Sequence, residues 1–308
     1  MNYFIYSKKI SILVATACIL TSSNLLSQST APNQKLSQFF ENYYNENHKI
    51  DPLSATFDGE NKYNDLLPAP DSKYLAELHN FRAKMLAELK KFDTKTLNEK
   101  DKISYLILKN RLENSLNSEQ FHTEYMPVDQ FNGIQLGIAI LGSGSTLQPF
   151  KTTKDYDNWL KRCAAIPNYI NVSIENMKKG VKTGIVIPKS TALKAIPQLE
   201  NLSKNDSTSV FYGPIKNFPE SFSKQDKVKY TTAFKKAIGG QVLPAYQKLL
   251  TYFKNDYLPK TRLTDGVNSL QTAMHFIKNL FLKALLRAKL LRKFTQSDLQ
   301  KWKELRVK

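Results

Sequence analysis

The 308-residue sequence has few cysteines and histidines, and this scarcity excludes several kinds of site. Cys18 and Cys163 are the two cysteines, which is too few for a disulfide framework. No H-E-x-x-H pair is present, so no spacing places two imidazoles and a general base on one helix face. No G-x-S-x-G elbow or P-loop occurs either. We therefore predict no catalytic residues and no metal ligands in this chain. The histidines, none within four residues of another, are His48, His79, His122 and His275.

Acidic residues are also scarce, with 27 Asp and Glu against 45 Lys and Arg, a formal net charge of +18. Residues 271–308 carry ten Lys/Arg and two acids, a net +8, and contain no Gly and no Pro. The other lysines lie mostly in helical stretches among Glu and Asp, which is typical of solvated helix faces. We predict no nucleic-acid partner.

Long hydrophobic runs are absent beyond residues 10–20 (ISILVATACIL), which follow Lys8 and Lys9. This pattern predicts a signal peptide over residues 1–29, since the run is short for a membrane span. The mature chain should have no transmembrane span and be exported, periplasmic or associated with the outer membrane. A lipid anchor at Cys18 is the alternative, disfavoured because Ala15 rather than Leu stands three residues before it. Cys163 would then be the lone cysteine, and we predict it to be a small core residue.

The remaining sequence predicts a mainly α fold. Apolar residues recur at helical spacing, and capping residues mark helix starts. Thr96 with Glu99, Thr152, and Ser223 with Asp226 are the predicted caps. We expect a kink or break at Pro167. The predicted helices cover residues 35–48, 72–92, 98–116, 154–179 with Gly180 after the end, 190–202, and about 224–257 through Pro244.

Two stretches predict irregular structure. The turn-rich sequence after residue 50 (DPLSATFDGENKYNDLLPAPDS) predicts a loop. Residues 127–150 (PVDQFNGIQLGIAILGSGSTLQPF) have four glycines and no helical period, so we predict an extended Gly-rich segment across the helices.

Several segments resemble, in order, the bacterial family called domain of unknown function 885, with coverage from about residue 36 to 270. They include FFENYYNENHKIDPLSATFDGENKYNDLLP, KISYLILKNRLE, PVDQFNGIQL, QPFKTTKDYDNWLKR, NMKKGVKTGIVIPK, IPQLENL, SVFYGPIKNFP and LPAYQKLLTYFKNDYLPKTRLTDGV. One departure is Lys178, where the family commonly shows Arg.

The resemblance implies a multi-helix, N-terminal part of a larger zincin-like protein. Family members are about twice this long and carry H-E-x-x-P-G-H in their later half, like zinc peptidases. Zinc and a peptide-like substrate are therefore expected for full-length relatives, and no cofactor for this chain. Within the resembling segments, Trp159, Lys178 and Tyr212 are our candidate substrate-binding residues.

The composition change after Leu270 suggests a shifted reading frame. With codons chosen freely, deleting one base from a sequence encoding LPNGDAFYK gives LQTAMHFI, residues 270–277. The same shift converts TPEIHAIGLAEVERVARK into LRKFTQSDLQKWKELRV, residues 291–307, and both parent phrases resemble the family. We therefore divide the chain into the signal peptide, a family region over residues 30–270 and an out-of-frame tail over 271–308. The alternative is a stand-alone periplasmic binding module whose basic tail contacts anionic lipid or protein.

Overall fold

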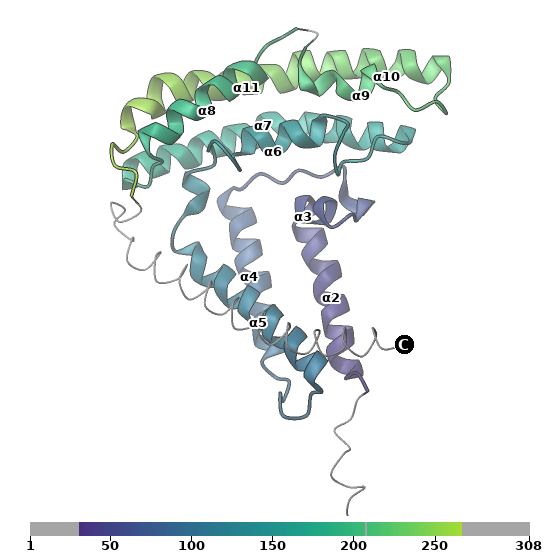
Figure 1. Ribbon diagram of the computed structural model, residues 1–308, viewed down its shortest axis with the longest axis vertical. Coiled ribbons are helices and arrows are strands. Elements are labelled where there is room, and N and C mark those ends of the chain that lie inside the picture. The colour runs from purple at the N-terminus through teal and green to yellow at the C-terminus, as the bar shows by residue number, and fades with distance from the viewer. Residues whose placement is uncertain (1–30, 207, 267–308) are drawn as a thin grey trace, which may run out of the picture.

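The computed structural model describes residues 31–206 and 208–266 (Figure 1). Within these ranges the regular structure is helical, with one isolated bridge between Pro188 and Arg262. The prediction of a mainly α fold is confirmed. The predicted signal peptide with Cys18, and the predicted tail with His275, lie outside the described residues.

Three helices form an arm that descends from the rest of the molecule (Figure 1). They are α2 (Gln34–Ile50), α4 (Ser72–Leu89) and α5 (Glu99–Glu119). Their starts are capped by side-chain oxygens of Asn33, Asp71 and Asn98, which accept backbone N–H groups that no helix carbonyl can reach. The arm has its own apolar core, made of Leu36, Phe81, Met85, Leu89, Leu97, Tyr105, Leu108 and Leu112.

The remaining helices form a body around α7 (Thr153–Thr183), the longest helix. Beside it lies α6 (Ile134–Gly142), and α8 (Lys189–Leu202), α9 (Gly213–Lys216), α10 (Lys224–Ala237) and α11 (Leu243–Tyr252) lie on its side away from the arm (Figure 1). The body has a second, larger core. Short helices complete the chain: α3 (Pro52–Phe57), η1 (Asn61–Tyr63), η2 (Thr123–Tyr125), η3 (Val210–Tyr212), η4 (Ile238–Val242), η5 (Phe253–Tyr257) and η6 (Leu258–Lys260).

Arg162 of α7 joins the body to the segment between α2 and α4. Its side chain is fully buried, and Nε donates to the Leu66 carbonyl at 3.0 Å. One terminal nitrogen donates to the Thr56 hydroxyl at 2.8 Å, and the other donates to the Gln148 side-chain carbonyl. These hydrogen bonds hold the arm's connecting segment against α7.

Several predicted helix ends are confirmed. The capping boxes of Thr152 with Asp155 and of Ser223 with Asp226 are both formed. Cys163 is buried in the core as predicted, and burial raises the pKa of its thiol to about 12.

Other predictions about α7 and α5 are wrong. Helix α7 does not break at Pro167, because a proline removes one backbone donor and packing on the body core supports the rest, whereas a kink there stays a prediction. It continues past Gly180 and ends at Gly184, whose left-handed φ of 75° terminates the helix. The cap of α5 is Asn98 rather than Thr96, because the Asn98 side chain accepts the Asp101 N–H.

Both predicted irregular stretches contain a helix. Helix α3 forms in the predicted loop because Asp51 caps it and Pro52 occupies the first turn, where no N–H is needed. Helix α6 forms within residues 127–150. Its sequence, IQLGIAILG, is apolar on all sides and therefore shows no amphipathic period.

The helix that continues from α10 contains two π-helical turns, η4 and η5. Gly239 and Gly240 lie in η4, and a Cβ at either position would meet no atom within 4 Å. We predict that Gly240→Ala raises the free energy of unfolding by about 0.5–1 kcal/mol, because alanine reduces the entropy of the unfolded chain. Urea denaturation measures this. An unchanged or lower midpoint would mean that the turn depends on glycine.

Buried tyrosines in the body predict instability in alkali. Burial raises the pKa of Tyr156 and Tyr257 to about 12, and raises that of Tyr246 well above its ordinary value. Unfolded phenols ionise near pH 10, so above that pH the folded protein binds more protons than the unfolded chain. The free energy of unfolding should therefore fall as the pH rises from 10 to 12. Tyrosinate absorbance and circular dichroism should change together; full ionisation with the helices intact would contradict the prediction.

Candidate functional site

A polar cavity lies between the arm and the body. It has a volume of 670 Å³ and is lined by residues of α4, α5, η2 and the segment before α6, with Tyr169 of α7 on the body side. A second cavity of 300 Å³ shares Leu75, Arg82, Glu119 and Glu124 with it and reaches Lys179 of α7. Because the two cavities share these side chains, we treat them as one groove, called the crevice.

A chain of charged groups forms the centre of the crevice. Glu119 of α5 accepts a hydrogen bond from Arg82 of α4 at 3.0 Å and contacts His79 Nδ1 at 2.6 Å, so both of its carboxylate oxygens are engaged. Beyond it, Glu124 contacts His122 Nδ1 at 2.9 Å. The arrangement fixes the Glu119 carboxylate on the arm and the Glu124 carboxylate in η2.

His122 has an unusual backbone. Its φ of 47° lies in the left-handed region, which is uncommon for a residue with a side chain. This conformation turns the chain from α5 into η2, and the imidazole stacks on Tyr125 with ring centroids 4.8 Å apart. The turn thereby brings His122 and Glu124 to the edge of the crevice.

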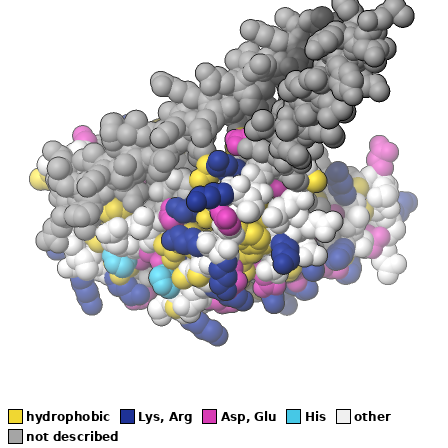
Figure 2. Space-filling view, turned by 90° about the horizontal axis from the view of Figure 1, so that it is seen from below, with side chains coloured by type: hydrophobic (Ala, Val, Ile, Leu, Met, Phe, Trp, Pro, Cys, Tyr) yellow, Lys and Arg dark blue, Asp and Glu magenta, His cyan; other side chains and the backbone are white. Residues whose placement is uncertain are grey.

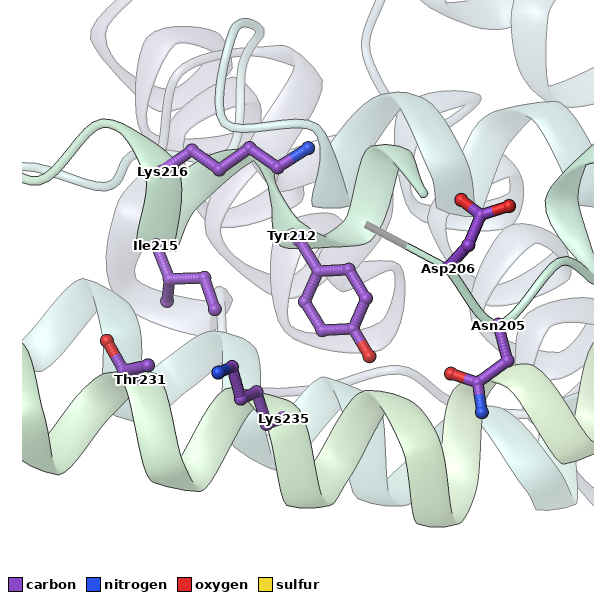
Figure 3. A pocket seen from close by; sticks show the side chains of 7 residues that line it. All are labelled: Asn205, Asp206, Tyr212, Ile215, Lys216, Thr231 and Lys235. Atoms are coloured by element: carbon purple, nitrogen blue, oxygen red, sulfur yellow. The ribbon is translucent and has the colours of Figure 1, made fainter. Parts of the chain in front are cut away.

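A separate pocket of 550 Å³ surrounds Tyr212 (Figure 3). Tyr212 and Ile215 come from the η3–α9 segment, and Thr231 and Lys235 come from α10. Figure 3 shows the Tyr212 hydroxyl directed between Lys235 and Asn205. The nearby Asp206 is held by the backbone N–H and hydroxyl of Thr208, which lower its pKa. The pocket is open and has polar groups on several sides.

The structure does not bring the three candidate substrate-binding residues together. Trp159 is buried in the body core beside Phe150. Lys178 lies on the surface, where it pairs with Glu175 at 2.7 Å and covers the Tyr252 ring. It is 19 residues along α7 from Trp159, roughly 28 Å for an α-helix. Of the three, Tyr212 alone lines a cavity described above, and a substrate-binding role for any of them stays a prediction.

The residues of the crevice were not predicted. Arg82 and Glu119 are 37 residues apart on different helices, so no spacing rule connects them. The polar faces of α4 and α5 gave the one available signal. Figure 2 views the molecule from below and shows Lys and Arg side chains on that face lying among acidic and hydrophobic ones, so charge alone does not mark a site there.

The described residues do not fit a zinc ion. His48, His79 and His122 each face a single carboxylate, on Asp58, Glu119 and Glu124 respectively. No group of three or more His, Cys, Asp or Glu side chains in residues 31–206 and 208–266 is placed to hold a metal. In the same ranges, no helix combines the length and apolarity needed to cross a membrane.

These features define a two-part helical protein with a polar crevice between arm and body. The family model described as "Bacterial protein of unknown function (DUF885)" matches residues 52–285, about three quarters of the sequence. The chain therefore belongs to this family, as its sequence segments predicted. The match runs 15 residues past Leu270, where we placed the change of reading frame. No curated protein matches the chain.

Two solved structures match this chain, and the first of them has a similar fold. One is described as "the putative lipoprotein from Colwellia psychrerythraea"; it has a TM-score of 0.63 and 16% identity, and the match covers 79% of this chain and 44% of that one. The other is described as "a putative lipoprotein of unknown function from Shewanella oneidensis", with a TM-score of 0.49, 17% identity, and 72% and 39% coverage. The matched region thus spans less than half the length of either structure.

Proposed function

We propose that this chain is the part of a DUF885 protein that precedes the metal-binding region, and that it supplies substrate-binding surface without catalytic groups. The extent of the fold match carries the proposal, because 79% of this chain corresponds to 44% of the Colwellia chain. The sequence resemblance adds that family members carry H-E-x-x-P-G-H in their later half. There, the two histidines would bind zinc and the glutamate would act as general base in peptide hydrolysis.

The crevice is the surface that suits this role. A peptide substrate presents amide groups and terminal charges, and the crevice is lined by two arginines, a lysine, three acidic residues and two tyrosines over adjoining cavities of 670 and 300 Å³. Those groups lie on two separate layers, so a ligand between arm and body would contact both.

Two further parts of the proposal concern residues outside the described ranges. The sequence over residues 1–29 would direct export, and the reading frame after Leu270 would be shifted. The family match to residue 285 places the end of the resemblance later than our codon argument does.

Metal content and peptide hydrolysis test the proposal. The chain alone should contain no stoichiometric zinc and cleave no peptide. A protein extended through the H-E-x-x-P-G-H region should bind zinc and cleave peptides, and replacing its motif glutamate with glutamine should remove hydrolysis while zinc is retained. Stoichiometric zinc in the chain alone, with hydrolysis that a chelator abolishes, would overturn the proposal.

A further inference from the structure

The crevice contains more hydrogen-bond donors than its own acceptors engage. Arg111 of α5 lines the crevice and makes no hydrogen bond or ion pair with any residue in the described ranges. Arg82 uses a single N–H, toward Glu119, so the rest of its guanidinium has no partner among the same residues. The hydroxyl of Tyr169 likewise donates to none of them. An arginine carries five N–H donors, so most of the donors of these two guanidinium groups remain available.

The acceptors of the crevice are largely engaged. Both oxygens of Glu119 are occupied by Arg82 and His79. One oxygen of Glu124 faces His122, and one oxygen of Asp129 accepts the backbone N–H groups of Phe131 and Asn132. The protein's own carboxylates therefore leave the available arginine donors without partners.

The two arginines act on one region. Burial raises the pKa of Tyr43, and the positive charges of Arg111 and then Arg82 oppose that rise. Tyr43 belongs to α2, so the field of both guanidinium groups also reaches the third helix of the arm. A ligand that enters here meets guanidinium groups from α4 and α5 together, beside the carboxylates of Glu119, Glu124 and Asp129.

We propose that the crevice binds a carboxylate group of its ligand, held by Arg111 and assisted by Arg82. A planar guanidinium matches a carboxylate with two parallel N–H···O bonds, a geometry that lysine cannot provide. The carboxylate belongs either to the C-terminus of a peptide or to a small organic acid. That the ligand is a peptide rests on the proposed function. That it carries a carboxylate is inferred from the available arginine donors of this chain.

Calorimetric titration of the full 308-residue chain tests the inference with three probes: N-acetyl-dialanine, the same dipeptide with an amidated C-terminus, and acetate. The free acid should bind about tenfold or more tightly than the amide, because the amide lacks the charge that the guanidinium groups recognise. Acetate as tight as the free acid would identify a small-acid site; weaker acetate would identify a peptide C-terminus. Equal binding of acid and amide, or no saturable binding of the acid, would overturn the inference.

The variants Arg111→Gln and Arg82→Gln should each weaken binding of the free acid about tenfold. Arg111→Lys should lose less affinity than Arg111→Gln, because lysine keeps the positive charge but cannot form two parallel hydrogen bonds. Lys84→Gln is the matched control. Lys84 is exposed on α4 and lines neither cavity, so the same loss of charge should leave binding unchanged. Thermal melting confirms that each variant is folded. Equal effects of Arg111→Gln and Lys84→Gln would show that the carboxylate responds to net charge alone and would contradict the proposal. Because these titrations need neither zinc nor hydrolysis, their failure is distinguishable from failure of the proposed function.

Discussion

Replacing Arg162 with methionine should lower the free energy of unfolding by about 3–5 kcal/mol, a large share of the stability of a typical domain. Methionine supplies similar volume but no donors. The Thr56 hydroxyl and the Gln148 side chain, both buried, would lose a donor, and so would the carbonyl of the more exposed Leu66. Each unsatisfied buried acceptor costs about 1–3 kcal/mol, which accounts for the size of the effect.

Arg162 is a buried side chain that carries a charge. Burial lowers its pKa to about 10, and Asp65 is the nearby charge that opposes this shift. The guanidinium is therefore still protonated at neutral pH, and neutral oxygens rather than a carboxylate hold it. Arg162→Lys should also destabilise the fold, because one ammonium cannot reach acceptors in three directions.

Urea denaturation followed by circular dichroism measures this effect. Lys161→Gln is the control, because Lys161 is exposed and its pair with Asp65 at 3.1 Å should contribute no more than about 1 kcal/mol. If Arg162→Met unfolds at the same urea concentration as the parent, Arg162 does not hold the connecting segment against α7.

Replacing Trp159 with alanine should cost about 3–5 kcal/mol as well, through the cavity it leaves in the body core. The indole is 1% exposed and packs against Phe150 with ring centroids 6.0 Å apart. It also requires a close neighbour without a side chain, since a Cβ at Gly142 would lie 2.5 Å from Trp159 Cζ2. Trp159→Phe should be much milder, because the indole N–H has no hydrogen-bond partner in the described structure.

The same pair of variants tests the candidate role of Trp159 in substrate binding. Phe131→Ala is the control, because Phe131 is 75% exposed and its loss should change stability by less than about 0.5 kcal/mol. Denaturation curves of the three variants should separate Trp159→Ala from the other two. A Trp159→Ala protein as stable as the parent would mean that the indole does not stabilise the body core. It would then favour the candidate role of Trp159 in substrate binding.

How far the fold follows from the sequence depends on how each helix is buried. Helices α7 and α10 begin at capping boxes and pack one face on the core. Their capping residues and their apolar periodicity can therefore be recognised in the sequence. Helix α6 carries apolar residues around its circumference, which removes the period. Helix α3 begins with Asp-Pro, a pair that also starts turns, and only its packing selects the helix.

The crevice was beyond prediction for a different reason. Its groups come from α4, α5, η2 and α7, and their meeting depends on how the arm lies against the body. That placement rests on long-range contacts such as those of Arg162 and the hydrogen bond from Asn176 to the Pro70 carbonyl at 2.9 Å. The spacing of residue types along one sequence does not show which distant residues form such pairs. By contrast, Cys163 could be assigned to the core from its helical surroundings alone.

We propose that this chain is one part of a larger DUF885 protein, and the DNA that follows its codons can test this. The most direct test is to sequence the genomic DNA across the codon for Leu270 and onward through the downstream region, in all three frames. The account predicts that restoring one base opens a frame that reads L-P-N-G and continues to H-E-x-x-P-G-H. DNA that confirms the present frame and encodes no such motif downstream would contradict the account, and the basic residues 271–308 would then belong to a stand-alone binding protein.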